Sequence, residues 1–136
     1  MIKIVNTSRN EIARSFSFGP IKRIMLGVRF QKLTERQQQA VLHHEMAHCE
    51  KHHTEWRLFF LIFAPFMFKW ICEKQELAAD RFAGEHGFAE PLIEILANEF
   101  DGGNFHPSNA MRRGYLKQHD QTRVVPVPDY NSPGLT

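Results

Sequence analysis

The chain has 136 residues, of which 43% are hydrophobic and 24% are charged. It is long enough for one domain with a hydrophobic core and too short for two, and its composition excludes disorder as the expected state. The formal net charge of +2 is too small to indicate a nucleic-acid-binding protein, or one drawn to an anionic membrane by its overall charge.

The N-terminal 30 residues predict β-strands. Isoleucine and valine open the chain, and Phe16 and Phe18 alternate with serines, a pattern typical of a half-buried strand. The turn signal Gly19-Pro20 follows, and a second candidate strand occupies Ile24–Phe30. We therefore expect a small antiparallel sheet ahead of the first helix.

A helix is expected to begin at Thr34 and to run through about His52. Thr34 and Gln37, three residues apart, form a capping box that satisfies backbone N–H groups of the first turn. Residues 1–119 are interpreted as one domain, and the proline-rich residues 120–136 as an extended tail. The remaining expected elements are helices at Glu73–His86, Pro91–Phe100 and Met111–His119 and a loop at Asp101–Asn104.

The first helix carries the pattern HExxH as His44-Glu45-Met46-Ala47-His48. Residues i and i+4 share one face of a helix, so both imidazoles can reach one zinc ion at about 2.0–2.1 Å. Glu45 is rotated by roughly 100° from His44 and stands beside the metal, where a carboxylate can accept a proton from bound water. The motif therefore predicts a zinc site with Glu45 as general base.

A catalytic zinc site needs a third protein ligand and one open position. The extended pattern HExxHxxGxxH does not supply it, because its last histidine falls on Thr54. Glu76 is the best candidate, and Asp80 shares its helix face at i+4. One of these carboxylates can bind zinc while the other orients a ligand histidine.

Other side chains near the motif are weaker candidates for the third ligand. Glu73 is the main carboxylate alternative, and Cys72 is a further one. His52 lies too far along the axis of a straight helix, and His43 and His53 are interpreted as packing or surface residues. Cys49 points away from the shared face and is expected to be a buried free thiol.

Four segments together resemble the HtpX-like gluzincins, a zinc peptidase family that includes the CAAX prenyl protease and the small soluble minigluzincins. ARSFSFGPIKRIMLG resembles the strand pair before the active-site helix, and LTERQQQAVLHHEMAH resembles that helix. ELAADRFAGEHGF resembles the ExxxD helix. HPSNAMRR resembles a His-Pro segment in which an arginine follows the histidine by six residues.

The resemblance implies three zinc ligands, His44, His48 and Glu76, with Asp80 supporting a ligand histidine. It also implies that His106 and Arg112 lie near the cleft, where they stabilise the oxyanion of the tetrahedral intermediate or orient the Glu76 carboxylate. Arg113 is an equally plausible neighbour of the cleft.

The segment Leu58–Phe68 is apolar on every side and contains Pro65. As a helix its eleven residues span about 16 Å, against a hydrocarbon core of about 30 Å, so it cannot cross a bilayer alone. It is either a buried core segment or an exposed surface that contacts a membrane interface or another protein, including a second copy of the chain.

The two cysteines, Cys49 and Cys72, do not make a disulfide framework, and the N-terminus lacks the apolar stretch of a signal peptide. We therefore expect a cytoplasmic protein with reduced thiols, in which Leu58–Phe68 is the candidate segment for association with a membrane.

The sequence thus predicts a compact α+β, zincin-like domain in which a small antiparallel sheet covers the active-site helix and the ExxxD helix. The expected reaction is peptide-bond hydrolysis, with substrate pairing to an exposed strand within Phe16–Phe30. Two alternatives stay open. One is a regulatory zinc peptidase that cleaves a repressor, and the other is a non-catalytic, zinc-stabilised module that docks through Leu58–Phe68.

Overall fold

The computed structural model describes residues 1–99, 102–103 and 105–120, and it has a mixed α+β architecture. Most of the proline-rich segment 120–136 and part of the expected loop Asp101–Asn104 lie outside the described residues. The elements run in the order β1 (Ile2–Asn6), β2 (Ala13–Phe18), β3 (Ile21–Leu26), η1 (Phe30–Lys32), α1 (Glu35–Glu50), α2 (His53–Phe63), η2 (Pro65–Met67), α3 (Phe68–Glu85), α4 (Ala89–Asn98) and α5 (Asn109–Gln118).

The sheet is mixed, so the expectation of an antiparallel sheet is wrong for one of its strands. Its order is β1-β3-β2, with β2 and β3 antiparallel and β1 parallel to β3. Gly19, at a φ of 54°, turns β2 into β3, as the turn signal indicated. Strand β3, which was expected at Ile24–Phe30, begins at Ile21 and ends at Leu26. The next residue, Gly27, packs against the Glu11 carbonyl, where a Cβ would overlap it.

The capping box at Thr34 forms as predicted, with Thr34 and Gln37 exchanging side-chain-to-backbone hydrogen bonds. The helix is shorter than expected, however, because α1 ends at Glu50. His52 takes a left-handed conformation, with φ 54° and ψ 40°, and α2 begins at the next residue. The chain therefore bends between the histidine motif and the apolar segment, instead of continuing as one helix.

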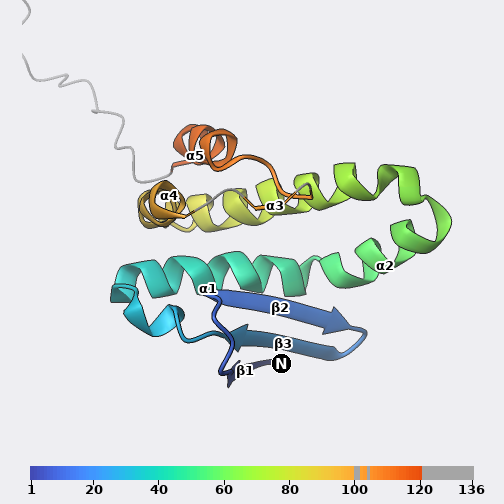
Figure 1. Cartoon of the computed structure of the whole chain (residues 1–136), viewed down its shortest axis with the longest axis horizontal. Coiled ribbons are helices and arrows are strands. Elements are labelled where there is room, and N and C mark those ends of the chain that lie inside the picture. Colours follow the sequence, from blue (N-terminus) through green and yellow to red (C-terminus); the bar gives the residue numbers. More distant parts are fainter. Residues whose placement is uncertain (100–101, 104, 121–136) are drawn as a thin grey trace, which may run out of the picture.

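Helix α1 lies between the sheet and α3 (Figure 1). Helices α4 and α5 pack on each other and on α3, away from the α2–α3 turn. This arrangement places the inner face of the HExxH helix directly against the helix that carries Glu76. The core consists of residues from all these layers, among them Ile24, Leu26, Val41, Ala83, Leu92, Leu96 and Leu116.

Three helices start at residues other than the predicted ones. Helix α3 starts at Phe68 instead of Glu73, since the chain resumes a helix directly after Pro65 opens η2. Helix α4 starts at Ala89, so Pro91 lies within its first turn. Proline is tolerated there because backbone N–H groups of the first turn have no acceptor within the helix, so no hydrogen bond is lost. Helix α5 starts at Asn109, where the Ser108 side chain accepts a hydrogen bond from Met111 N.

The apolar segment Leu58–Phe68 is largely exposed, so its interpretation as a buried core segment is wrong. Phe63 is 69% exposed and Phe66 is 86% exposed. The segment spans the end of α2, the short helix η2 and the start of α3. Within the described part of the chain, no helix combines the length and apolar character that crossing a membrane requires.

Candidate metal centre

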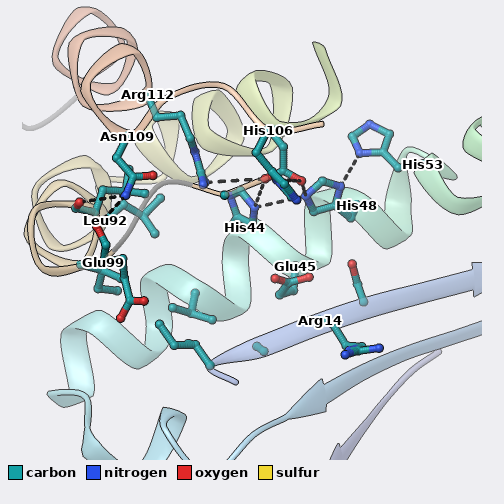
Figure 2. A pocket seen from close by; sticks show the side chains of 18 of the residues that line it. Arg14, His44, Glu45, His48, His53, Leu92, Glu99, His106, Asn109 and Arg112 are labelled. Atoms are coloured by element: carbon teal, nitrogen blue, oxygen red, sulfur yellow. Dashed lines mark hydrogen bonds and ion pairs between the residues drawn. The ribbon is translucent and has the colours of Figure 1, made fainter. Parts of the chain in front are cut away.

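Two histidines of α1 face the interior one helical turn apart. His44 and His48 are 7% and 6% exposed, and their Nε2 atoms lie 3.1 Å from each other. The i, i+4 spacing on a well-capped helix accounts for this pairing. The Nε2 atoms of the two rings therefore point at one position between α1 and α3 (Figure 2).

Glu76 completes the group from α3. Its Oε2 lies 3.3 Å from His44 Nε2, and its Oε1 lies 3.4 Å from His48 Nε2. One ligand atom from each of the three residues lies within 4.8 Å of the others, so one small ion can contact all three side chains. His44, His48 and Glu76 can thus hold a metal ion.

Asp80 contacts His44 on the Nδ1 side of its ring, and Arg112 in turn binds Asp80. Asp80 Oδ1 lies 2.9 Å from His44 Nδ1, although it is not aligned well enough for a hydrogen bond. Arg112 donates two hydrogen bonds to Asp80, from Nε and Nη2, at 2.7 and 2.8 Å. A cation fixed in this way keeps the fully buried Asp80 carboxylate ionised and in place against the ring.

The pKa values of this group reflect its charges. Burial lowers the pKa of His44, but contacts with Asp80 and Glu76 outweigh burial and raise it to about 10. Burial raises the pKa of Glu76, but His44, His48 and Arg112 outweigh burial and hold it well below its ordinary value. Glu76 is therefore a carboxylate, ready to bind a cation, at any pH near neutrality.

Glu76 has a second cationic neighbour that the sequence interpretation missed. Arg57 of α2 donates from Nη2 to Glu76 Oε1 at 3.1 Å and from Nε to the Gln75 side-chain oxygen at 2.6 Å. In the sequence, Arg57 was only a flank of the apolar segment. Its spacing gives no sign of this contact, because the contact depends on the bend at His52.

His53 is buried beside the site and is not one of its three candidate ligands, so the surface alternative of its interpretation is wrong. It is 6% exposed, and its Nδ1 lies 2.7 Å from His48 Nδ1. Its main-chain oxygen accepts a hydrogen bond from Gln75. If His48 binds a metal through Nε2, its Nδ1 carries the proton and donates to His53. His53 thereby holds the His48 ring in the orientation that a metal needs.

Glu45 lies beside the histidines, on the side toward β2 (Figure 2). Burial raises the pKa of Glu45 above its ordinary value, although the charge of His44 and a hydrogen bond with Ser15 oppose the rise. A raised pKa suits a carboxyl group that must both accept and release a proton near neutral pH. The position agrees with the 100° rotation expected from the motif.

A cavity of about 380 Å³ opens onto Glu45, His44 and His48. Residues 13–15, at the start of β2, line the cavity, and so does His53. The cavity thus combines charged groups at the metal centre with an apolar wall. That wall consists of Val41, Leu92, Ile95 and Leu96.

His106 also lines this cavity, with Nδ1 3.9 Å from Glu76 Oε1 and a side chain that is 44% exposed. Arg112 lines it too, but its guanidinium is mainly engaged with Asp80 and lies 3.7 Å from Glu76 Oε2. His106 is therefore the freer of the two groups to meet a bound molecule.

The alternative ligands lie elsewhere. Glu73 faces Lys69 at 3.8 Å, and His52 pairs with Glu55 at 3.1 Å. Cys49 is the buried free thiol that the sequence predicted, with its sulfur 3.6 Å from the Arg23 carbonyl oxygen. Cys72 is also a buried free thiol. Among the residues that the structure describes, neither cysteine belongs to the metal-binding group.

Comparisons with protein-family models, with curated proteins and with solved structures found no match for the chain. Its function must therefore be inferred from the geometry and chemistry of the site.

Proposed function

We propose that the chain is a zinc metallopeptidase in which His44, His48 and Glu76 bind the metal and Glu45 is the general base. The observation that carries the proposal is the cluster of ligand atoms: the two histidine Nε2 atoms lie 3.1 Å apart, each lies 3.3–3.4 Å from one of the two Glu76 oxygens, and the buried carboxyl group of Glu45 lies beside them. Two imidazoles and one carboxylate are a ligand set of catalytic zinc sites, which keep a fourth position open for water or substrate.

When bound, the zinc ion would lower the pKa of a water molecule and polarise the scissile carbonyl group. Glu45 would accept the proton of that water and pass it to the leaving amine. A purely structural zinc site has four protein ligands and needs no such base. The presence of Glu45 therefore favours hydrolysis over a zinc-stabilised binding module.

The free edge of β2 supports a peptide substrate. Because β2 pairs only with β3 among the described strands, its other edge has no strand partner, although α2 contacts it at Ser17. Ser17 N donates to Thr54 Oγ1, so Ser17 has its backbone groups on that edge. By the two-residue repeat of a strand, Ser15 and Ala13 present theirs there too. Both residues line the cavity, so a substrate strand would pair there rather than within Phe16–Phe30.

Asp80 and His53 would each fix one ligand ring, and His106 would donate to the developing oxyanion. An HExxH helix packed against a helix with a later Glu and Asp also fits the HtpX-like gluzincins. We accordingly propose that the domain is a minimal, zincin-like member of that group.

Comparison of wild-type protein with Glu45→Gln tests the proposal. Both proteins are loaded with zinc, their zinc content is measured, and hydrolysis of casein and of a mixed peptide library is followed. We expect equal zinc content and a fall in hydrolysis of roughly 100-fold or more, as for the loss of a general base. Equal hydrolysis by both proteins would rule out Glu45 as the base.

A further inference from the structure

The turn that joins α2 to α3 forms one end of the molecule along its long axis (Figure 1). Its apolar side chains are unusually exposed: Leu58 by 45%, Phe59 by 47%, Leu61 by 53%, Ile62 by 62% and Phe63 by 69%. Soluble monomers rarely leave so many large apolar side chains together in water, and such surfaces mark interaction sites.

From this exposed end we infer that the segment from Trp56 to Trp70, called the apolar tip below, inserts peripherally into the interface of an anionic lipid bilayer. The inference concerns an interaction surface and does not depend on the proposed chemistry of the metal centre.

The shape of the apolar tip favours lipid over a rigid partner. With 3.6 residues per turn, the exposed residues from Leu58 to Phe63 cover an arc of about 200° around α2. Phe66, 86% exposed, caps the end in η2. A rigid protein covers one face of such a projection, whereas acyl chains and headgroups can surround it. A helix of eleven residues is also too short to span a bilayer, which fits insertion at the interface.

Its aromatic residues are placed as an interfacial segment requires. Trp56 and Trp70, 52% and 50% exposed, lie at the two ends of the apolar tip, and tryptophan favours the headgroup level of a bilayer. Between them the sequence contains no acidic residue. The two tryptophans would thus mark the depth to which the phenylalanines between them insert.

Two lysines lie on the α3 side of the base of the apolar tip, whereas the acid on the α2 side, Glu55, is bound by Ser17, Gly19 and His52. Lys69 has a side chain that is 61% exposed, and Lys74 lies over the Trp70 ring at 5.7 Å. Glu73 is the opposing acid, in a surface contact with Lys69, and such contacts are weak. Arg57 turns inward to Glu76. A local excess of lysines beside apolar side chains suits anionic headgroups, although the net charge of the whole chain is small.

Vesicle flotation with the full chain tests the inference, using phosphatidylcholine alone and phosphatidylcholine mixed with phosphatidylserine. The chain has two tryptophans, both in the apolar tip, so its own fluorescence reports insertion. We expect wild-type protein to float with the mixed vesicles and its emission to shift to shorter wavelength. Lys69→Gln with Lys74→Gln should reduce binding to the mixed vesicles to the level seen with phosphatidylcholine alone.

Phe63→Ser with Phe66→Ser removes two strongly exposed side chains and should lower vesicle binding by roughly tenfold or more. Phe18→Ser with Ile21→Ser is the matched control, because these residues are 55% and 49% exposed on the sheet. It should bind vesicles as the wild type does.

Absence of both flotation and the emission shift in wild-type protein would overturn the inference, whatever the variants do. If that protein instead self-associates in analytical ultracentrifugation, and the Phe63/Phe66 variant does not, the apolar tip is an interface between copies of the chain. Equal loss of vesicle binding in the sheet control would also contradict the assignment to the tip.

Discussion

Arg112→Met should destabilise the zinc-free protein strongly, because it leaves the Asp80 carboxylate buried without its cation. Asp80 is fully buried and receives two hydrogen bonds from Arg112 at 2.7 and 2.8 Å. Removing one partner of a buried ion pair costs about 3–5 kcal/mol. The Arg112 side chain is 14% exposed and His44 remains beside Asp80, so we expect the lower end, about 3 kcal/mol.

Urea unfolding in the presence of a chelator measures this cost without any contribution from metal binding. With an m-value of about 2 kcal/mol/M, the unfolding midpoint should fall by about 1.5 M. Arg113→Met is the control and should change the free energy of unfolding by less than about 0.5 kcal/mol.

The pH dependence of this effect has a defined sign. Burial raises the pKa of Asp80, but Arg112 and His44 outweigh burial and lower it. The stabilisation by the ion pair is therefore fully present above the ordinary aspartate pKa of about 3.9, and it is lost as the pH falls through the lower folded-state value. An Arg112→Met protein as stable as the wild type at pH 7, but slower by roughly 100-fold in hydrolysis, would refute this reasoning and assign Arg112 to the oxyanion.

Three further predictions concern neighbouring residues. His53→Ala should weaken zinc affinity by roughly 10–100-fold, since it releases the His48 ring, whereas His52→Asn should leave affinity unchanged in the same competition titration with a chromogenic chelator. His106→Ala should slow hydrolysis by roughly 100-fold with full zinc content, in line with loss of an oxyanion donor; an unchanged rate would exclude that role. Burial raises the pKa of Glu55, but hydrogen bonds from Ser17 and His52 outweigh it and lower the pKa to about 2. The stability difference between wild type and Glu55→Gln should therefore be constant above about pH 4.5 and shrink as the pH falls toward 2; a difference that persists at pH 2 would contradict it.

The part of the site that sequence could predict is the part determined by local geometry. His44 and His48 follow from the i, i+4 repeat of a helix whose start is marked by Thr34 and Gln37. Glu76 was predicted as the third ligand because a catalytic zinc site needs one and because the chain resembles the HtpX-like gluzincins. In the structure, the Glu76 oxygens lie 3.3 and 3.4 Å from the Nε2 atoms of His44 and His48.

The part that sequence could not predict depends on contacts between distant segments. The left-handed turn at His52 has no glycine or asparagine to signal it, yet it brings His53 to His48 and Arg57 to Glu76. The parallel pairing of β1 with β3 depends on how the connection from Asn6 to Ala13 crosses the sheet, which strand periodicity does not encode. The exposure of the apolar tip also contradicts the rule that such segments form the core.

Zinc analysis of purified, dialysed protein tests the central claim most directly, with wild type, Glu76→Ala and Glu73→Ala compared in parallel. The two glutamates lie on the same helix three residues apart, but only Glu76 faces the histidines. We predict about one zinc ion per chain in the wild type and in Glu73→Ala, and loss of most of the zinc from Glu76→Ala. Full zinc occupancy in Glu76→Ala would contradict the proposed metal centre.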